Sequence, residues 1–213
     1  MIQKNNIIDI SWPTSPAMTT YKNKGGVAFT PTKTFQLDGA RETMITIPSH
    51  NGTHVDAPSH FIEHAASVDQ ANLSSLVGPC VIIDLTHVQE RITKEDLVQC
   101  SIQPHARILL KTRNSSRPAT ESFDPSFVYL DARGAQYLVD CNVMTVGIDA
   151  LGIERNQPGH ETHSLLLSNN ITIIEGLRLA SVQAGSYYLC CLPLLLAGLD
   201  AAPARAIVLN EPH

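Results

Sequence analysis

The sequence predicts a mixed α/β fold in which few helices accompany a central mixed sheet. Short β-branched runs outnumber helical patterns, which indicates that strands supply most of the core. Several of these runs are continuously apolar, a pattern typical of strands that are buried on both faces. With 213 residues, 43% of them hydrophobic and 16% charged, the chain can fill one domain that spans residues 1–213.

Eight runs are predicted to be strands because β-branched and other apolar residues dominate them. They cover residues 7–10, 43–47, 81–85, 107–111, 127–130, 143–148, 171–174 and 206–209. A further stretch, residues 18–35, contains Gly25 and Gly26 with prolines nearby. Because glycine and proline favour turns, this stretch is predicted to form either a hairpin or a loop that folds over a cleft.

Three segments carry helix signals. Thr93 is a candidate N-cap that is followed by Glu95 and Asp96 in the first turn, so a short helix is expected to run to Cys100. Residues 131–140 and 162–168 are also predicted to be helical. These few helices, set among many strands, complete the predicted mixed fold.

Composition excludes several kinds of partner. A net charge of -5 and an isoelectric point near 5.9 argue against a nucleic-acid-binding surface. The longest apolar run, residues 187–198, is interrupted by Pro193 and is too short to span a membrane. The first residues lack the apolar core of a signal peptide, and the five cysteines form no C-x-x-C pair. A cytoplasmic protein is therefore expected.

Residues 50–60 hold the strongest functional signal. Four of their side chains are common metal ligands or proton carriers, namely His50, His54, Asp56 and His60. Their even spacing would place all four on one side of an extended chain. The segment must bend for them to share an ion, and Gly52 and Pro58 stand where it could bend. A solvent-exposed loop rich in histidine is the alternative interpretation.

A catalytic metal site keeps a coordination position for water, so the protein ligands do not saturate the ion. His50, His54 and Asp56 are the candidate ligands in this segment. His60 is the candidate proton carrier, because an imidazole titrates near neutral pH. More distant ligands could come from His160 or His163 and from Glu175, which closes an apolar strand.

The pattern H-x-G-T-H-x-D-x-P-x-H over residues 50–60 resembles the signature of the cyclase family of metal-dependent hydrolases. That family includes kynurenine formamidases (arylformamidases) and isatin hydrolases. The resemblance extends over nearly the whole chain, through residues 8–11, 146–149, 192–194 and 200–206. It implies a swivelling β/β/α domain and a homodimer or larger assembly. It also implies that residues 18–35 could reach into a neighbouring subunit.

The resemblance further implies a site with two divalent metal ions, zinc or alternatively manganese. His50, His54 and Asp56 would bind the first ion, with Asp56 bridging to the second. The family then places a distal histidine twelve residues before a glutamate, which selects His163 and Glu175, with His160 as the fallback. His60 matches the family's general acid/base. The remaining histidines match no position of the family.

The implied reaction is hydrolysis of a C–N amide bond in a small molecule, either an aryl formamide or a cyclic amide or imide. In the arylformamidases a tryptophan lines the aryl pocket, and Tyr21 takes its place here, whereas Trp12 falls well before it. Thr53 stands where the formamidases commonly have alanine. Both departures count against N-formylkynurenine as the substrate. The alternative function is a non-catalytic protein of the same fold that binds a metal or small ligand.

Overall fold

A computed structural model describes residues 7–210. The strands within these residues are β1 (Ile7–Asp9), β2 (Ala28–Lys33), β3 (Glu42–Thr46), β4 (His54–Asp56), β5 (Val77–Asp84), β6 (Arg91–Ile92), β7 (Arg107–Lys111), β8 (Tyr129–Leu130), β9 (Thr145–Ile148), β10 (Thr172–Glu175), β11 (Gly185–Pro193) and β12 (Ala201–Asn210). The α-helices are α1 (Phe35–Asp38), α2 (Leu73–Leu76), α3 (Lys94–Val98), α4 (Ala132–Asp140) and α5 (Glu161–Ser168). The predicted mixed α/β fold with few helices is confirmed.

Eight strands form the central sheet in the order β1-β12-β11-β5-β7-β9-β10-β4. The four strands β5, β7, β9 and β10 run parallel to one another, and the remaining pairings are antiparallel. Because β4 pairs with β10 on one edge and with the start of β12 on the other, seven strands close into a barrel-like ring. This closure leaves β4 hydrogen-bonded on both edges.

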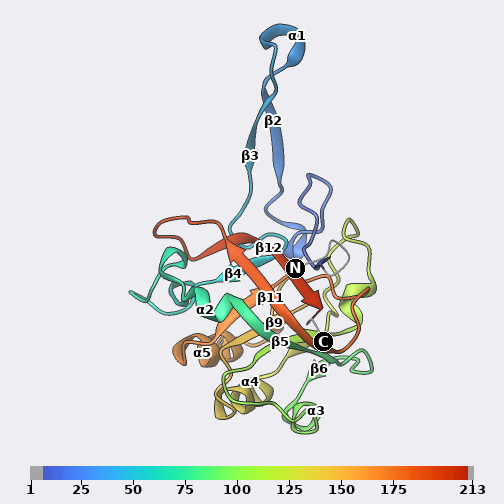
Figure 1. Cartoon of the computed structure of the whole chain (residues 1–213), viewed down its shortest axis with the longest axis vertical. Helices are drawn as coiled ribbons and strands as arrows, with labels where there is room; N and C mark the ends of the chain where they lie inside the picture. The colour runs from blue at the N-terminus through green and yellow to red at the C-terminus, as the bar shows by residue number, and fades with distance from the viewer. Residues whose placement is uncertain (1–6, 211–213) are drawn as a thin grey trace.

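Both faces of β7, β9 and β10 are buried, as their continuous apolar runs predict, whereas β5 exposes Val81 on one face. In β7, Ile108 and Leu110 join a cluster that includes Leu138 of α4 and Leu166 of α5, whereas Leu109 joins a second cluster enclosed by the sheet. Side chains alternate between the two faces of a strand, so one apolar run fills both clusters. The helices α3 to α5 thus cover one face of the sheet (Figure 1).

Side chains cap the first turns of α3, as predicted from Thr93, and of α4. Thr93 forms a capping box with Asp96 at the start of α3. The side chain of Asp131 accepts a hydrogen bond from the Gly134 backbone at the start of α4, 2.7 Å away. Such side chains satisfy backbone N–H groups that have no partner within the helix. The three predicted helices are therefore confirmed: α3 and α4 are slightly shorter than predicted, whereas α5 begins one residue earlier, at Glu161.

The hairpin β2–α1–β3 projects away from the body of the molecule (Figure 1). It covers residues 28–46, so of the stretch 18–35, predicted to be either a hairpin or a loop over a cleft, only the last residues belong to the hairpin. The preceding residues differ in character, since Met18 and Val27 are buried against Trp12. The predicted run 43–47 forms β3 in this hairpin rather than a strand of the central sheet.

Seven other predicted runs also contain strands, although residues 127–130 form only the short β8, which pairs with β6 outside the central sheet. The sequence missed β2, β4, β6 and β11. Among the described residues, no helix is both long and apolar enough to cross a lipid bilayer.

Candidate metal centre and adjoining pocket

The centre is built where β4 lies against β10. Their antiparallel register pairs His54 with Glu175 and Asp56 with Ile173. His54 and Asp56 are two residues apart on a strand, so both side chains leave β4 on the same face. The resulting carboxylates and imidazole are almost wholly buried. Gly176 permits this packing: it adopts φ +68°, and a Cβ atom there would lie 2.1 Å from the Gly52 carbonyl oxygen.

His54 is held in one orientation. Its Nδ1 donates a hydrogen bond to the carbonyl oxygen of Gly52 at 2.9 Å, so Nε2 is the nitrogen that could bind a cation once it has lost its proton. This Nε2 lies 3.4 Å from Asp56 Oδ1 and 3.4 Å from Glu175 Oε2. The pairing of a backbone carbonyl with the far nitrogen is the usual way in which proteins orient a histidine ligand.

His163 reaches the same point from α5. Its Nε2 lies 3.3 Å from Glu175 Oε1 and 3.7 Å from Asp56 Oδ2, while its Nδ1 lies 3.1 Å from Glu154 Oε2. His160, the fallback residue, instead contacts the other oxygen of Glu154 through Nδ1 and has a side chain that is 55% exposed. The structure therefore brings His163 into the cluster and leaves His160 outside it.

His50 and His60 complete the cluster from the loop on either side of β4. His50 Nδ1 lies 3.0 Å from Asp56 Oδ1, and its Nε2 donates to Asp200 Oδ2 at 2.8 Å. His60 stacks on His50 with the ring centroids 3.9 Å apart, and its Nδ1 lies 3.8 Å from the same Asp200 oxygen. Asp200 thus orients both imidazoles.

The chemistry of these donors fits divalent cations. His54 Nε2 and both Asp56 oxygens are buried and make no hydrogen bond of regular geometry within residues 7–210, although they face the other donor atoms of the cluster at 3.0–3.7 Å. Buried polar atoms without partners are costly unless another group satisfies them. Imidazole nitrogens and carboxylate oxygens that converge in this way are the ligands preferred by zinc and manganese.

The pKa values of the histidines in the cluster also indicate a site for a cation. Burial opposes charge on His54, but the adjoining carboxylates of Asp56 and Glu175 outweigh it and raise its pKa to about 10. Burial likewise opposes charge on His163, and Glu154 with Glu175 raises its pKa to about 10. Without a cation the carboxylates therefore hold protons on the imidazoles, and a bound metal would replace those protons.

His60 responds in the opposite direction. Burial is the main cause, and with the nearby His50 and His163 it lowers the pKa of His60 to about 4, against the pull of Asp56. Its imidazole is consequently neutral at pH 7. A neutral histidine beside a cluster of metal-ligand type can accept a proton from water and return it to a leaving group.

Sequence reasoning missed two residues of this centre. Glu154 bridges His160 and His163, and Asp200 bridges His50 and His60. Asp200 lies in the closing segment that carries the family resemblance, so a signal for it existed. Glu154 follows Gly152 and Ile153 in a loop, with no pattern that marks it.

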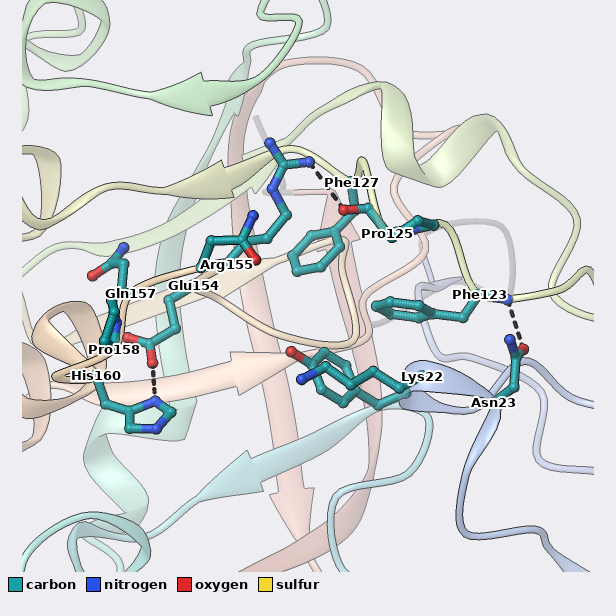
Figure 2. A pocket seen from close by; sticks show the side chains of 12 residues that line it. Lys22, Asn23, Phe123, Pro125, Phe127, Glu154, Arg155, Gln157, Pro158 and His160 are labelled. Atoms are coloured by element: carbon teal, nitrogen blue, oxygen red, sulfur yellow. Dashed lines mark hydrogen bonds and ion pairs between the residues drawn. The ribbon is translucent and has the colours of Figure 1, made fainter.

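A pocket of about 730 Å³ adjoins the centre: Glu154, which contacts His163, lines it together with His160 (Figure 2). Tyr21, the residue expected to contact an aryl group, lines this pocket with Phe123 and Phe127. The Tyr21 and Phe123 rings meet edge to face, with their centroids 4.9 Å apart. Aromatic walls beside a cluster of ionisable residues are typical of a small-molecule site.

The fold and this cluster define the class of protein. Its members have a closed mixed sheet that carries a cluster of histidines and carboxylates, of the kind that binds metal, beside an aromatic pocket. The sequence model of the family described as "Putative cyclase" matches residues 8–155. The chain belongs to this family.

Relatives match along nearly the whole chain. Cyclase-like protein 3 of Oryza sativa subsp. japonica is 33% identical over 216 residues, which cover 96% of this chain and 80% of the relative. A kynurenine formamidase of Salinibacter ruber is 32% identical over 209 residues, which cover 97% of this chain and 98% of the relative.

Solved structures share the fold. A protein from Bacillus stearothermophilus, named a "predicted metal-dependent hydrolase", is 42% identical, with a TM-score of 0.87 over 96% of this chain and 98% of that one. Isatin hydrolase A from Ralstonia solanacearum is 19% identical, with a TM-score of 0.83 over 96% and 92% of the two chains. At that identity the second likeness concerns the fold alone.

Proposed function

We propose that this protein is a metal-dependent hydrolase that cleaves a C–N amide bond in a small aryl formamide or a cyclic amide or imide. The proposal depends mainly on one observation. Five side chains of metal-ligand type from three separate segments lie close together beside an aromatic pocket, and some of their buried polar atoms make no hydrogen bond within residues 7–210. The kynurenine formamidase and metal-dependent hydrolase names among the relatives support the same class of reaction.

Two divalent ions, zinc or manganese, are proposed as the cofactor. His50, His54 and Asp56 would hold the first, since their donor atoms lie within 4.8 Å of one another. Asp56, His163 and Glu175 would hold the second, because His163 Nε2 faces both carboxylates. When bound, the ions would make a coordinated water more acidic and polarise the substrate carbonyl.

The side chains around this centre have distinct parts in the reaction. His60, neutral because its pKa is lowered to about 4, would accept the proton of the attacking water and deliver it to the departing nitrogen. Asp200 would keep that imidazole oriented. Glu154 would fix the ring of His163, and the Gly52 carbonyl fixes the ring of His54.

The aromatic pocket would hold the ring of the substrate, with Tyr21 as one wall. Phe123 and Phe127 also line it, and they offer an apolar surface on the side of the centre where Glu154 and His160 lie. A substrate held there would present its amide toward the imidazoles and carboxylates of the centre.

A homodimer or larger assembly and a cytoplasmic location are part of the proposal. The projecting hairpin supports the assembly, since Phe35 and Leu37 at its tip are 64% and 87% exposed. A two-stranded hairpin is marginally stable alone, and contact with a second copy would cover these side chains. The five cysteines, an odd number without a C-x-x-C pair, support a reducing compartment.

Metal analysis followed by a substrate screen tests the function. The purified protein is expected to hold up to two equivalents of zinc or manganese and to hydrolyse at least one of N-formylkynurenine, formanilide, isatin or a simple cyclic imide. Chelation should abolish the activity, and adding back the metal should restore it. Two equivalents of metal without hydrolysis of any such compound would favour the non-catalytic binding protein instead.

A further inference from the structure

The pocket beside the metal centre has an apolar part formed by three aromatic rings. Tyr21 and Phe123 meet edge to face, and the Phe123 and Phe127 rings also meet edge to face with centroids 5.7 Å apart. Rings arranged in this way favour a flat aromatic ligand. Such rings do not distinguish between aromatic ligands of different charge, so any selectivity for charge must come from a polar or charged group.

Lys22 is the charged group available for this choice. It lines the pocket, its Nζ lies 5.2 Å from the centroid of the Tyr21 ring, and its side chain extends toward the middle of the pocket in Figure 2. Within residues 7–210, no carboxylate forms an ion pair with it.

The other charged groups of the pocket are already engaged. Arg155 donates to the carbonyl oxygen of Pro125 at 3.2 Å and pairs with Glu90 at 3.4 Å. Glu154 is shared by His160 and His163. The pocket of this acidic protein therefore presents one cation without a counter-ion among the described residues.

The backbone at Lys22 adopts an energetically unfavourable conformation. Lys22 and Asn23 adopt φ values of 53° and 55°, in the left-handed region that residues with a Cβ atom rarely occupy. The Asn23 side chain accepts a hydrogen bond from the Phe123 backbone N–H at 2.9 Å, which ties this turn to the aromatic wall. Strained backbone that persists at a pocket commonly serves the ligand bound there.

We propose that Lys22 selects substrates that carry a negatively charged group on the aromatic part, so that the substrate class is an aryl amide with a carboxylate substituent. This inference rests on the proposed hydrolase function. The ring would lie against Tyr21, Phe123 and Phe127, and the carboxylate would pair with the Lys22 ammonium. Lys22 would then determine specificity while taking no part in bond cleavage.

The test compares formanilide with its ring-carboxylated counterparts, the formylaminobenzoates, on the metal-loaded protein. The variants are Lys22→Met, which keeps the stem and removes the charge, and Lys22→Arg, which keeps the charge. Lys24→Met is the matched control, since Lys24 is an exposed lysine two residues away that does not line the pocket. KM and kcat are measured for each compound at two salt concentrations.

Lys22→Met is expected to raise KM for the best formylaminobenzoate about tenfold, with kcat little changed and with less than a twofold effect on formanilide. Lys22→Arg should retain most of the preference, and Lys24→Met should behave as the wild type. Added salt should weaken the wild-type preference and leave Lys22→Met unaffected, because only a charge contact is screened. Equal effects on both compounds, or no effect, would overturn the inference.

Binding separates failure of this inference from failure of the proposed function. Dissociation constants for the same compounds are measured by calorimetry on the metal-loaded His60→Ala protein, with and without Lys22→Met. A carboxylate preference that disappears with Lys22→Met supports the inference even if the wild type hydrolyses neither compound. The hydrolase proposal fails separately, when no compound of the wider substrate screen is hydrolysed. A preference that survives Lys22→Met would show that another group binds the carboxylate.

Discussion

His54 and Glu175 lie directly opposite each other across β4 and β10, and His54 Nε2 is 3.4 Å from Glu175 Oε2. This pair joins the local motif of residues 50–60 to the distant half of the chain. Burial and Asp56 favour the neutral form of Glu175, yet His54 and His163 outweigh them and lower its pKa to about 2. At pH 7 without a metal, the His54 imidazole is therefore protonated and the Glu175 carboxylate is ionised.

Metal binding to the metal-free protein should release protons. The pKa values of His54 and His163 are about 10, so both imidazoles are protonated at pH 7 and must lose those protons to bind a cation. Calorimetric titration with zinc in buffers of different ionisation enthalpy should give about two protons released per fully loaded site. The affinity should rise with pH between about 6 and 9, since deprotonation becomes easier. A proton release near zero would contradict this account.

His163→Ala and His160→Ala should differ in metal content. His163 faces Glu175 and Asp56, whereas His160 contacts Glu154 at the edge of the pocket. Removing a ligand should weaken metal binding by at least 10- to 100-fold, the range seen when even supporting residues are lost. His160→Ala should keep its metal. The metal content of both variants is measured by elemental analysis after dialysis against a weak chelator. A lower metal content in His160→Ala than in His163→Ala would make His160 the ligand.

His60→Ala should abolish turnover while leaving the metal content unchanged. The expected loss in kcat is about 10²- to 10⁴-fold, the usual contribution of a general acid/base. The stack of His60 on His50 and its distance from Asp200 place it beside the cluster rather than within the paired carboxylates. Loss of metal in this variant would reassign His60 as a ligand, because its donor atom also comes within 4.8 Å of those of Asp56 and His163.

The local half of the site could be predicted because its four residues lie within one short segment. Alternation along an extended chain places His54 and Asp56 on one face, and the structure has them so. Glu175 was a candidate from its place at the end of an apolar strand, the family spacing selected His163 over His160, and the structure places His163 and Glu175 beside His54 and Asp56. Glu154 could not be found in the same way, because its role depends on partners that only tertiary packing brings near. Asp200 lies in the segment 200–206 that carries the family resemblance, but its contacts with His50 and His60 also depend on tertiary packing.

The missed strands have physical reasons of their own. Two of the three residues of β4 are polar side chains buried for function, so β4 shows no apolar run. β11 ends at Pro193, and a proline argues against a regular interior strand. The hairpin strand β2 is exposed along its whole length, so burial imposes no pattern on it. A prediction from hydrophobic periodicity finds strands with a regular pattern of buried apolar residues, and these strands lack such a pattern.

Gly176→Ala should destabilise the protein far more than Gly39→Ala. Both glycines adopt φ +68°, so alanine is strained at each position by about 1 kcal/mol. At Gly39 nothing lies within 4 Å of the added Cβ, whereas at Gly176 it would meet the Gly52 carbonyl oxygen at 2.1 Å. The expected cost at Gly176 is therefore several kcal/mol, measured by urea denaturation of the metal-free proteins. Equal midpoints would show that this close approach is not required.

Removing the hairpin should convert the proposed assembly into monomers. Ala28 and Thr46 are paired in the hairpin register, so residues 29–45 can be replaced by a short turn that still joins the two positions. Light scattering should give a dimer or larger species for the full chain and a monomer for the shortened one. Replacing Phe35 and Leu37 by serine should act in the same direction, because they are the apolar side chains at the tip. A full-length monomer at micromolar concentration would exclude the assembly, and an undiminished assembly after shortening would place the contact elsewhere.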